Sequence, residues 1–165
     1  MSAAPAVRGS VVPGPRLRPD FELAGSKLYV SLWPIAIIDI GNANRATYEA
    51  LFAKVDELVI ARKQPYVMVT DTRRVTEIPG ADVRKFMADW MKKNATGHTS
   101  LGSVTIVRSA LVRGALTALY WIFQPPNPQG VAGTWTEAHT WSMDHFDRAR
   151  VPVRPSVRDA STEPY

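Results

Sequence analysis

The order of hydrophobic and polar positions divides the chain into alternating strands and helices. In residues 21–33 apolar and polar side chains alternate, so this segment predicts two short strands around a turn at Gly25-Ser26. Residues 35–39 are mostly apolar and fit either an edge strand or a buried connection. The first part of the domain is therefore predicted as a small β-structure, and the role of its last segment is left open.

Four further segments have apolar residues three and four positions apart, the spacing of amphipathic helices: 42–64, 80–94, 109–123 and 134–146. Asn44 is suited to cap the first helix, and Thr134 with Glu137 has the spacing of a capping box at the last. Short apolar runs between the helices predict buried strands at 66–70, 102–107 and 131–134. The order β-β-α-β-α-β-α-β-α predicts a single α/β domain, with a mixed, mostly parallel sheet of four to six strands and about four helices.

Length and composition agree with one soluble domain that carries a basic tail at each end. The 165 residues are 45% hydrophobic and 21% charged, as in globular proteins. A composition rich in Pro, Ser, Ala and Arg predicts disordered tails at 1–20 and 150–165, around a folded domain at 21–149. The net charge of +5 belongs to the two ends, because residues 20–147 hold equal numbers of acidic and basic side chains. We therefore expect no nucleic-acid binding by the folded domain.

The most apolar part of the chain is SVTIVRSALVRGALTALYWIF, residues 103–123, which Arg108 and Arg113 interrupt. After Arg113 only ten residues remain before QPPNPQG ends the run, whereas a membrane-spanning helix needs about 20. We therefore expect a core strand and a core helix here, and no transmembrane segment. The first 20 residues lack the apolar core of a signal peptide. Because the chain has no cysteine, the reducing cytoplasm is the expected compartment.

Two strand-to-helix turns hold the residues best suited to bind a partner or a ligand. In parallel α/β sheets, ligands gather where the carboxyl ends of neighbouring strands meet. If the strands at 66–70 and 102–107 are neighbours, their turns bring together charged and hydroxyl side chains: Asp71, Thr72, Arg73, Arg74, Arg108, Ser109 and Arg113. Such guanidinium groups, with the amides that begin helix 109–123, suit a phosphate or a carboxylate. The alternative is that Asp71 pairs with the arginines and that Ser109 only caps its helix.

No combination of residues predicts a catalytic centre. Ser109 lacks the glycines of the Gly-x-Ser-x-Gly nucleophile motif, since Val107 and Leu111 occupy those positions. His139 and His145 are six residues apart on one helix and face different ways, so they do not form a metal-binding pair. We therefore expect a non-enzymatic protein without a catalytic residue, a metal site or a cofactor.

Two stretches carry a family resemblance: YVMVTDTRRVTEIPGADVRKFM, and VTIVRSALVRGALTALYW followed by a proline loop and TWTEAHTW. With its elements in this order, the chain resembles the STAS-like fold of anti-sigma-factor antagonists and sulfate-transporter cytosolic domains over about residues 21–147. It is also similar to the related small CRAL-TRIO-type domains, some of which hold lipids. Anti-sigma-factor antagonists carry a phosphorylatable Ser or Thr where this chain has PGAD, residues 79–82, and Thr76 is the nearest hydroxyl. The resemblance implies an interaction module, without the family's phosphorylated position.

We therefore expect a cytoplasmic, regulatory protein-binding module whose partner is another protein or a second copy of this chain. The predicted binding surface is the loop 71–78, which contains Thr76, together with the start of helix 109–123. The alternative is a domain that binds a small anionic ligand, a lipid or a nucleotide, between the turns at 71–74 and 108–113. A pocket at the strand ends favours the ligand, and a flat, filled surface favours the protein module.

Overall fold

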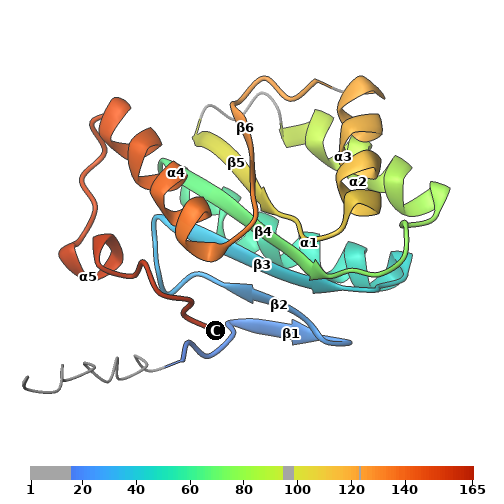
Figure 1. Cartoon of the computed structure of the whole chain (residues 1–165), viewed down its shortest axis with the longest axis horizontal. Coiled ribbons are helices and arrows are strands. Elements are labelled where there is room, and N and C mark those ends of the chain that lie inside the picture. Colours follow the sequence, from blue (N-terminus) through green and yellow to red (C-terminus); the bar gives the residue numbers. More distant parts are fainter. Residues whose placement is uncertain (1–15, 95–98, 123) are drawn as a thin grey trace, which may run out of the picture.

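The computed structural model describes residues 16–94, 99–122 and 124–165, and it shows an α/β fold around one mixed sheet (Figure 1). Within these residues the sheet has six strands: β1 Phe21–Leu23, β2 Ser26–Tyr29, β3 Ile35–Gly41, β4 Tyr66–Arg74, β5 Ser100–Ile106 and β6 Gln129–Ala132. The helices are α1 Arg45–Leu58, the 3-10 turn η1 Ile60–Arg62, α2 Ala81–Asn94, α3 Ala110–Ile122, α4 Trp135–Arg148 and α5 Pro155–Arg158. The predicted α/β class and mixed sheet are confirmed.

The order of strands across the sheet is their order along the chain. β1, β2 and β3 pair in antiparallel fashion, and β3, β4, β5 and β6 pair in parallel. The β1–β2 hairpin turns at Ala24 and Gly25, whose φ angles of 48° and 75° are both positive. A two-residue turn of type I′ requires this combination, and it begins one residue before the predicted position.

Helices α1, α2 and α3, which connect the parallel strands, all lie on one face of the sheet. Each parallel step from β3 to β6 passes through one helix, α1, α2 or α3, and all three steps go the same way. Because such crossovers are right-handed, their helices lie on the same face of the sheet. α4 follows the last strand and packs with α5 against the opposite face (Figure 1).

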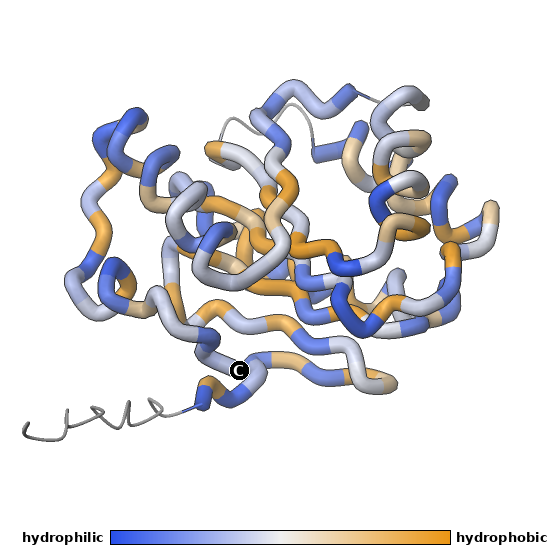
Figure 2. The backbone as a smooth tube through the Cα atoms, viewed as in Figure 1, coloured by the Kyte–Doolittle hydropathy of each residue, from blue (hydrophilic) through white to orange (hydrophobic). Residues whose placement is uncertain are grey.

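The central strands are buried on both faces, and alternate side chains enter two separate cores. In β3, Ile35 and Ile37 belong to the core that also contains Trp135 and Phe146 of α4, whereas Ala36 and Ile38 belong to the core on the side of α1. Figure 2 shows the resulting apolar residues along the middle of the sheet. Full burial of one aliphatic side chain stabilises a fold by about 1.5–3 kcal/mol, so β3 is a major source of stability.

The position of β3 corrects the predicted order of elements. The segment 35–39 was expected to be an edge strand or a connection, with two strands before the first helix. Instead β3 is a full strand inside the sheet, between β2 and β4, and it adds a third strand before α1. A strand buried on both faces carries apolar side chains at every position, so it lacks the alternation by which a half-buried strand is recognised.

The C-terminal segment also differs from the prediction of a disordered tail at 150–165. Val157 in α5 is 1% exposed, and its carbonyl oxygen lies 2.7 Å from Nε2 of His139. The indole N–H of Trp135 donates to the carbonyl of Ala160 at 2.8 Å. The segment covers the part of the sheet around β2 and β3 that α4 does not contact. Its apolar residues are too irregularly spaced to indicate a helix or a strand, which is why composition alone suggested disorder.

At the other end, residues 1–15 of the predicted N-terminal tail lie outside the described residues. Leu17 lies within the described residues, and its N–H donates a hydrogen bond to the carbonyl of Pro164, in the C-terminal segment, at 2.6 Å. The tail expected at 1–20 therefore ends earlier than predicted, because Leu17 packs against the core on the α4 face.

Both predicted N-caps are confirmed. The side-chain oxygen of Asn44 accepts a hydrogen bond from the N–H of Thr47 at 3.0 Å. Thr134 accepts one from the N–H of Glu137 at 3.2 Å. These caps fix where α1 and α4 begin, and hence where each helix meets the sheet.

Candidate functional site

The predicted strand-end residues separate onto two faces of the sheet, although β4 and β5 are parallel neighbours as expected. Asp71 faces the C-terminal segment and is 3% exposed. Its carboxylate accepts hydrogen bonds from the guanidinium of Arg73 at 2.6 Å and from the hydroxyl of Tyr165 at 2.8 Å. Arg73 also pairs with Glu163 at 2.7 Å. The C-terminal segment therefore covers the pair that was expected to meet a partner.

Electrostatics keep this pair ionised. Burial alone raises the pKa of Asp71, but hydrogen bonds from the side chain and main chain of Arg73 and from Tyr165 outweigh it and hold the pKa below its usual range. Hydrogen bonds to Asp71 and then Glu163 raise the pKa of Arg73. Asp71 and Arg73 thus satisfy each other within the fold.

A second carboxylate–arginine pair lies on the neighbouring strand. Asp39 is opposite Asp71 in the β3–β4 register, and Nε of Arg74 donates to its Oδ1 at 2.9 Å. Arg74 also donates to the carbonyl of Gly25, in the β1–β2 turn. Burial raises the pKa of Asp39 and outweighs the lowering by Arg74. Two adjacent carboxylates therefore each have their own arginine. The Asp71–Arg73 pair is the alternative that the sequence left open, and the Asp39–Arg74 pair was not predicted.

Thr72 and Thr76 make bonds that hold the loop after β4. Thr72 points to the other face of the sheet from Asp71, and its hydroxyl donates to the carbonyl of Ile106 at 2.7 Å. Thr76 is exposed, and its hydroxyl accepts from Nδ2 of Asn42 at 2.7 Å. The N–H of Thr76 donates back to Asn42 at 2.9 Å. Asn42 thereby fixes this loop against the end of β3.

The second predicted turn does not join the first. Ser109 accepts a hydrogen bond from the N–H of Leu111 at 3.2 Å, so it acts as a cap of α3. Arg108 and Arg113 are exposed. Within the described residues, no hydrogen bond or ion pair links these arginines to residues 71–74. The eight predicted residues therefore do not converge on one anion site.

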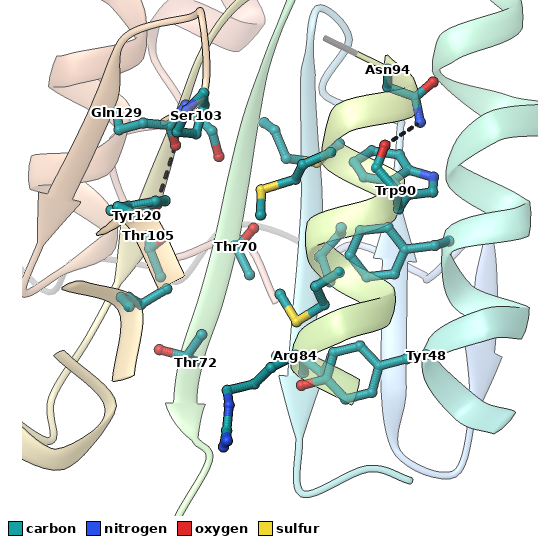
Figure 3. A pocket seen from close by; sticks show the side chains of 18 of the residues that line it. Tyr48, Thr70, Thr72, Arg84, Trp90, Asn94, Ser103, Thr105, Tyr120 and Gln129 are labelled. Carbon is teal, nitrogen blue, oxygen red and sulfur yellow. Dashed lines mark hydrogen bonds between the residues drawn. The ribbon is translucent and has the colours of Figure 1, made fainter. Parts of the chain in front are cut away.

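A cavity of about 190 Å³ lies on the other face of the sheet, beneath α1, α2 and α3 (Figure 3). Strands β3, β4 and β5 form its floor, and the three helices form its walls. The proline-containing loop 125–127 contributes to the lining as well. The cavity thus sits within the layer made by the three crossover helices.

The cavity has one apolar and one polar side. Side chains of β3, β4, α1 and α2 form the apolar side: Ile38, Phe52, Met68, Met87, Trp90 and Met91. Hydroxyl and amide groups of β4, β5, β6 and α3 form the polar side: Thr70, Ser103, Thr105, Tyr120 and Gln129. Figure 3 shows Ser103, Thr105 and Tyr120 across the cavity from Trp90. An apolar lining with a few convergent polar groups is typical of small-molecule sites.

Arg84 on α2 carries the one charge among the described residues that line the cavity. One of its amino groups donates to the carbonyl of Pro79 at 2.7 Å. Its remaining donors have no hydrogen-bond acceptor within the described part of the protein. Figure 3 shows Arg84, Thr72 and Tyr48 toward one end of the cavity, and Ser103 toward the other.

Two tyrosine hydroxyls in the lining stay protonated at neutral pH. Burial raises the pKa of Tyr48 to about 12. Burial also raises the pKa of Tyr120, against a smaller lowering by a hydrogen bond with Thr105. The hydroxyl of Tyr120 donates to Oε1 of Gln129 at 3.2 Å. The Tyr48 hydroxyl is therefore a neutral hydrogen-bonding group, whereas the Tyr120 hydroxyl already uses its hydrogen and offers its oxygen as an acceptor.

The cavity exists because α3 packs incompletely on the sheet. Among the described side chains of this very apolar helix only Val112 is buried, whereas Leu111 is 51% and Trp121 is 82% exposed. A helix that buries so little of its apolar surface leaves space beneath it and an apolar surface above it. Residues 103–122 of this stretch thus form the predicted strand and helix, but the helix is not a filled core element. Phe123 lies outside the described residues.

No three His, Cys, Asp or Glu side chains in the described ranges are placed to hold a metal ion. His139 forms a hydrogen bond with the main-chain carbonyl of Val157 at 2.7 Å. His145 forms one with the main-chain carbonyl of Trp141 at 2.8 Å. In the described part of the chain, no helix has the length and hydrophobicity to cross a bilayer.

Sequence reasoning missed the cavity, although one signal was present. In β4 and β5 four positions that face α1–α3 carry hydroxyls: Thr70, Thr72, Ser103 and Thr105. Their neighbours on the opposite face are Val69 and Asp71 in β4, and Val104 and Ile106 in β5. In a strand that is covered on both faces, every position is expected to be apolar. A polar face on a central strand therefore indicated a surface that protein atoms do not fill.

Comparison of the chain with protein-family models, with curated proteins and with solved structures finds no match. The resemblance to STAS-like domains therefore stays a prediction. The interpretation of the site rests on its own geometry.

Proposed function

We propose that this protein binds a small, mostly apolar molecule in the cavity between the sheet and helices α1–α3. The observation that carries the proposal is the two-sided lining, in which an apolar wall faces a row of hydroxyl and amide groups. The proposal retains small-ligand binding, which was the alternative function predicted from the sequence. It places the binding site in the cavity and not at the turns 71–74 and 108–113. The turns at 71–74 and 108–113 offer paired or outward-facing charges instead.

Packing supports the same proposal. Protein interiors are close-packed, and an unfilled cavity lowers the free energy of unfolding. Polar groups on a covered sheet face cost further free energy unless they find partners. A ligand that fills the space and forms hydrogen bonds with Thr70 or Ser103 offsets both costs.

The STAS-like class is part of the proposal. A single α/β domain with a mixed sheet and helices on both faces supports it, and the resemblance to small CRAL-TRIO-type domains fits an apolar ligand. We propose a binding and regulatory role in the cytoplasm, which the absence of cysteine supports.

Native mass spectrometry of the protein, purified gently from its own cells, tests the proposal. Ala115 lines the cavity from α3, so Ala115→Leu fills part of it. Ala118 is exposed on the same helix, and Ala118→Leu is the matched control. We expect a bound small-molecule mass in the wild type and in Ala118→Leu, and its loss in Ala115→Leu.

Two results contradict the proposal. One is a bound mass that Ala115→Leu retains, because the ligand then lies elsewhere. The other is that native mass spectrometry finds no bound small molecule and that titration calorimetry finds no saturable binding of octanoate or 1-octanol to the wild type. Ala115→Leu is expected to unfold at the same or a higher temperature than the wild type, because it fills space. Lost binding with retained stability separates a filled cavity from a misfolded variant.

A second candidate function is protein binding on the outer face of α3, where Leu111 and Trp121 are exposed. Arg108, just before α3, and Arg113, in its first turn, are exposed as well. Exposed aromatic residues and arginines are enriched at protein interfaces. The partner would therefore present acidic residues around an apolar centre. This second candidate retains the protein-binding role predicted from the sequence. It places the binding surface on the outer face of α3 and not on the loop 71–78.

Affinity purification from the protein's own cells, with the wild type and with a Trp121→Ser/Arg113→Glu variant, tests this second candidate. We expect the wild type to retain an acidic protein that the variant and raised salt both release. A partner that the variant retains equally well would place the interface elsewhere. Recovery of the same partner with Ala115→Leu would show that the surface acts independently of the cavity.

A further inference from the structure

We propose that the ligand of the cavity is a monoanion whose charged group binds Arg84 and whose apolar body lies along Met68, Met87 and Trp90. This inference rests on the proposed function and adds the chemical class of the ligand. A small carboxylic acid with an aliphatic chain or a single ring fits the description.

Charge is the first argument. Arg84 is the one charged residue in the described lining, and no carboxylate accompanies it there. Arg84 is half-buried beside an apolar wall, and a guanidinium group forms strong, charge-assisted hydrogen bonds with a carboxylate. Because only one of its amino groups is engaged, by the carbonyl of Pro79, it retains the donors for a carboxylate.

The geometry at this end of the cavity is the second argument. Tyr48 and Arg84 lie toward the same end in Figure 3, and burial keeps the Tyr48 hydroxyl protonated, with a pKa of about 12. The hydroxyl is thus a second donor for the anion. Thr72 is occupied by the carbonyl of Ile106, so its hydroxyl hydrogen does not compete for the anion.

The rest of the cavity limits the size and polarity of the ligand. The volume of about 190 Å³ is below the range of roughly 300–1,000 Å³ that is usual for drug-sized ligands. The apolar side accepts a hydrocarbon chain or ring. Gln129 and Ser103, away from Arg84, offer uncharged groups that suit a hydroxyl or a carbonyl and do not suit a second charge.

Three probes of equal chain length, octanoate, 1-octanol and octylamine, test the assignment by titration calorimetry. We expect octanoate to bind the wild type about tenfold more tightly than 1-octanol, as charge-assisted hydrogen bonds predict. Octylamine is expected to bind most weakly. Arg84→Gln should weaken octanoate about tenfold and leave 1-octanol unchanged. Arg148→Gln, which makes the same change in net charge on an exposed part of α4 on the opposite face of the sheet, should alter neither affinity.

The outcomes separate this inference from the proposed function. Equal binding of octanoate and 1-octanol, unaffected by Arg84→Gln, overturns the anion assignment and leaves the cavity as a binding site. A preference for octylamine overturns it as well. If no probe binds while Ala115→Leu still removes an endogenous mass, the ligand class is wrong and the site is right. If neither is seen, both proposals fail. Binding of 1-octanol to Arg84→Gln also shows that the variant is folded.

Discussion

The hydroxyl of Tyr165 donates a hydrogen bond of 2.8 Å to Asp71, a residue 94 positions earlier in the chain. The ring of Tyr165 stacks on Tyr29 at a centroid distance of 5.3 Å and meets Trp135 edge-on at 5.9 Å. Asp71 lies near the end of β4, so this contact fastens the C-terminal segment to the centre of the sheet. The segment is therefore part of the folded domain.

Removal of the Tyr165 hydroxyl should destabilise the fold measurably. We expect Tyr165→Phe to lower the free energy of unfolding by about 1.5–3 kcal/mol, the usual contribution of a hydrogen bond to a charged group. Tyr165→Ala should lower it further, because the contacts with Tyr29 and Trp135 are also lost. Urea unfolding measures both, with the exposed Thr162→Ala as the control. Equal stability of all three variants would mean that the segment does not pack on the sheet.

Acid should remove the stability that Asp71 contributes. Its pKa is below the usual range in the folded protein and about 3.9 in an unfolded chain. As the pH falls through the ordinary value, the unfolded state takes up the proton first, so the contribution of Asp71 declines toward its lower folded pKa. We expect Asp71→Asn to be less stable than the wild type at neutral pH and to lose less stability on acidification. Thermal unfolding across this pH range tests the expectation.

Asp39, opposite Asp71 on β3, should have the reverse effect. Because its pKa is raised in the folded protein, the folded state takes up the proton before the unfolded state does as the pH falls. Protonation of Asp39 therefore favours the fold between the ordinary and the raised pKa. We expect Asp39→Asn to lose stability more steeply than the wild type on acidification. If the stability of Asp39→Asn and of Asp71→Asn changed with pH in the same way, the raised pKa of Asp39 and the lowered pKa of Asp71 would both be contradicted.

Two glycines should respond to alanine in opposite ways. A Cβ on Gly102 in β5 would lie 2.6 Å from the Trp141 ring and 2.9 Å from the carbonyl oxygen of Pro128. Gly102→Ala should therefore lower the free energy of unfolding by about 1–3 kcal/mol. At Gly114 in α3, no described atom outside the backbone of the helix itself lies within 4 Å of the corresponding position, so Gly114→Ala should stabilise the helix by about 0.5–1 kcal/mol. Chemical unfolding measures the free energy of unfolding of both variants. A lower free energy for Gly114→Ala would contradict the prediction and mean that α3 packs closely at that point.

Elements that depend on neighbouring residues could be predicted from the sequence. The helices α1 to α4 and the strands β4 to β6 appear close to the expected ranges, because apolar spacing and caps such as Asn44 act within one or two turns. The Asp71–Arg73 pair, two residues apart, was foreseen as the alternative to a binding site. The partners that complete it, Glu163 and Tyr165, could not be foreseen, because long-range pairing leaves no local pattern.

The candidate site depended on packing between elements and not on a motif. Thr70 and Ser103 belong to different strands, and Arg84 and Tyr48 to different helices. Only the parallel register of β4 and β5 and the placement of α1–α3 on one face bring these residues to one cavity. The hydroxyl positions in β4 and β5 were visible in the sequence, but their shared face was not.

Local spacing of apolar residues was enough to establish the α/β class, the order of most elements and their caps, because those features depend on neighbours along the chain. Tertiary structure alone decided that β3 lies inside the sheet, that residues 151–165 cover one of its faces, and that α3 leaves a cavity on the other. Each of these is a question of which surfaces remain uncovered once the helices have packed. Residues distant in sequence fill those surfaces or leave them open, so spacing along the chain does not record the result.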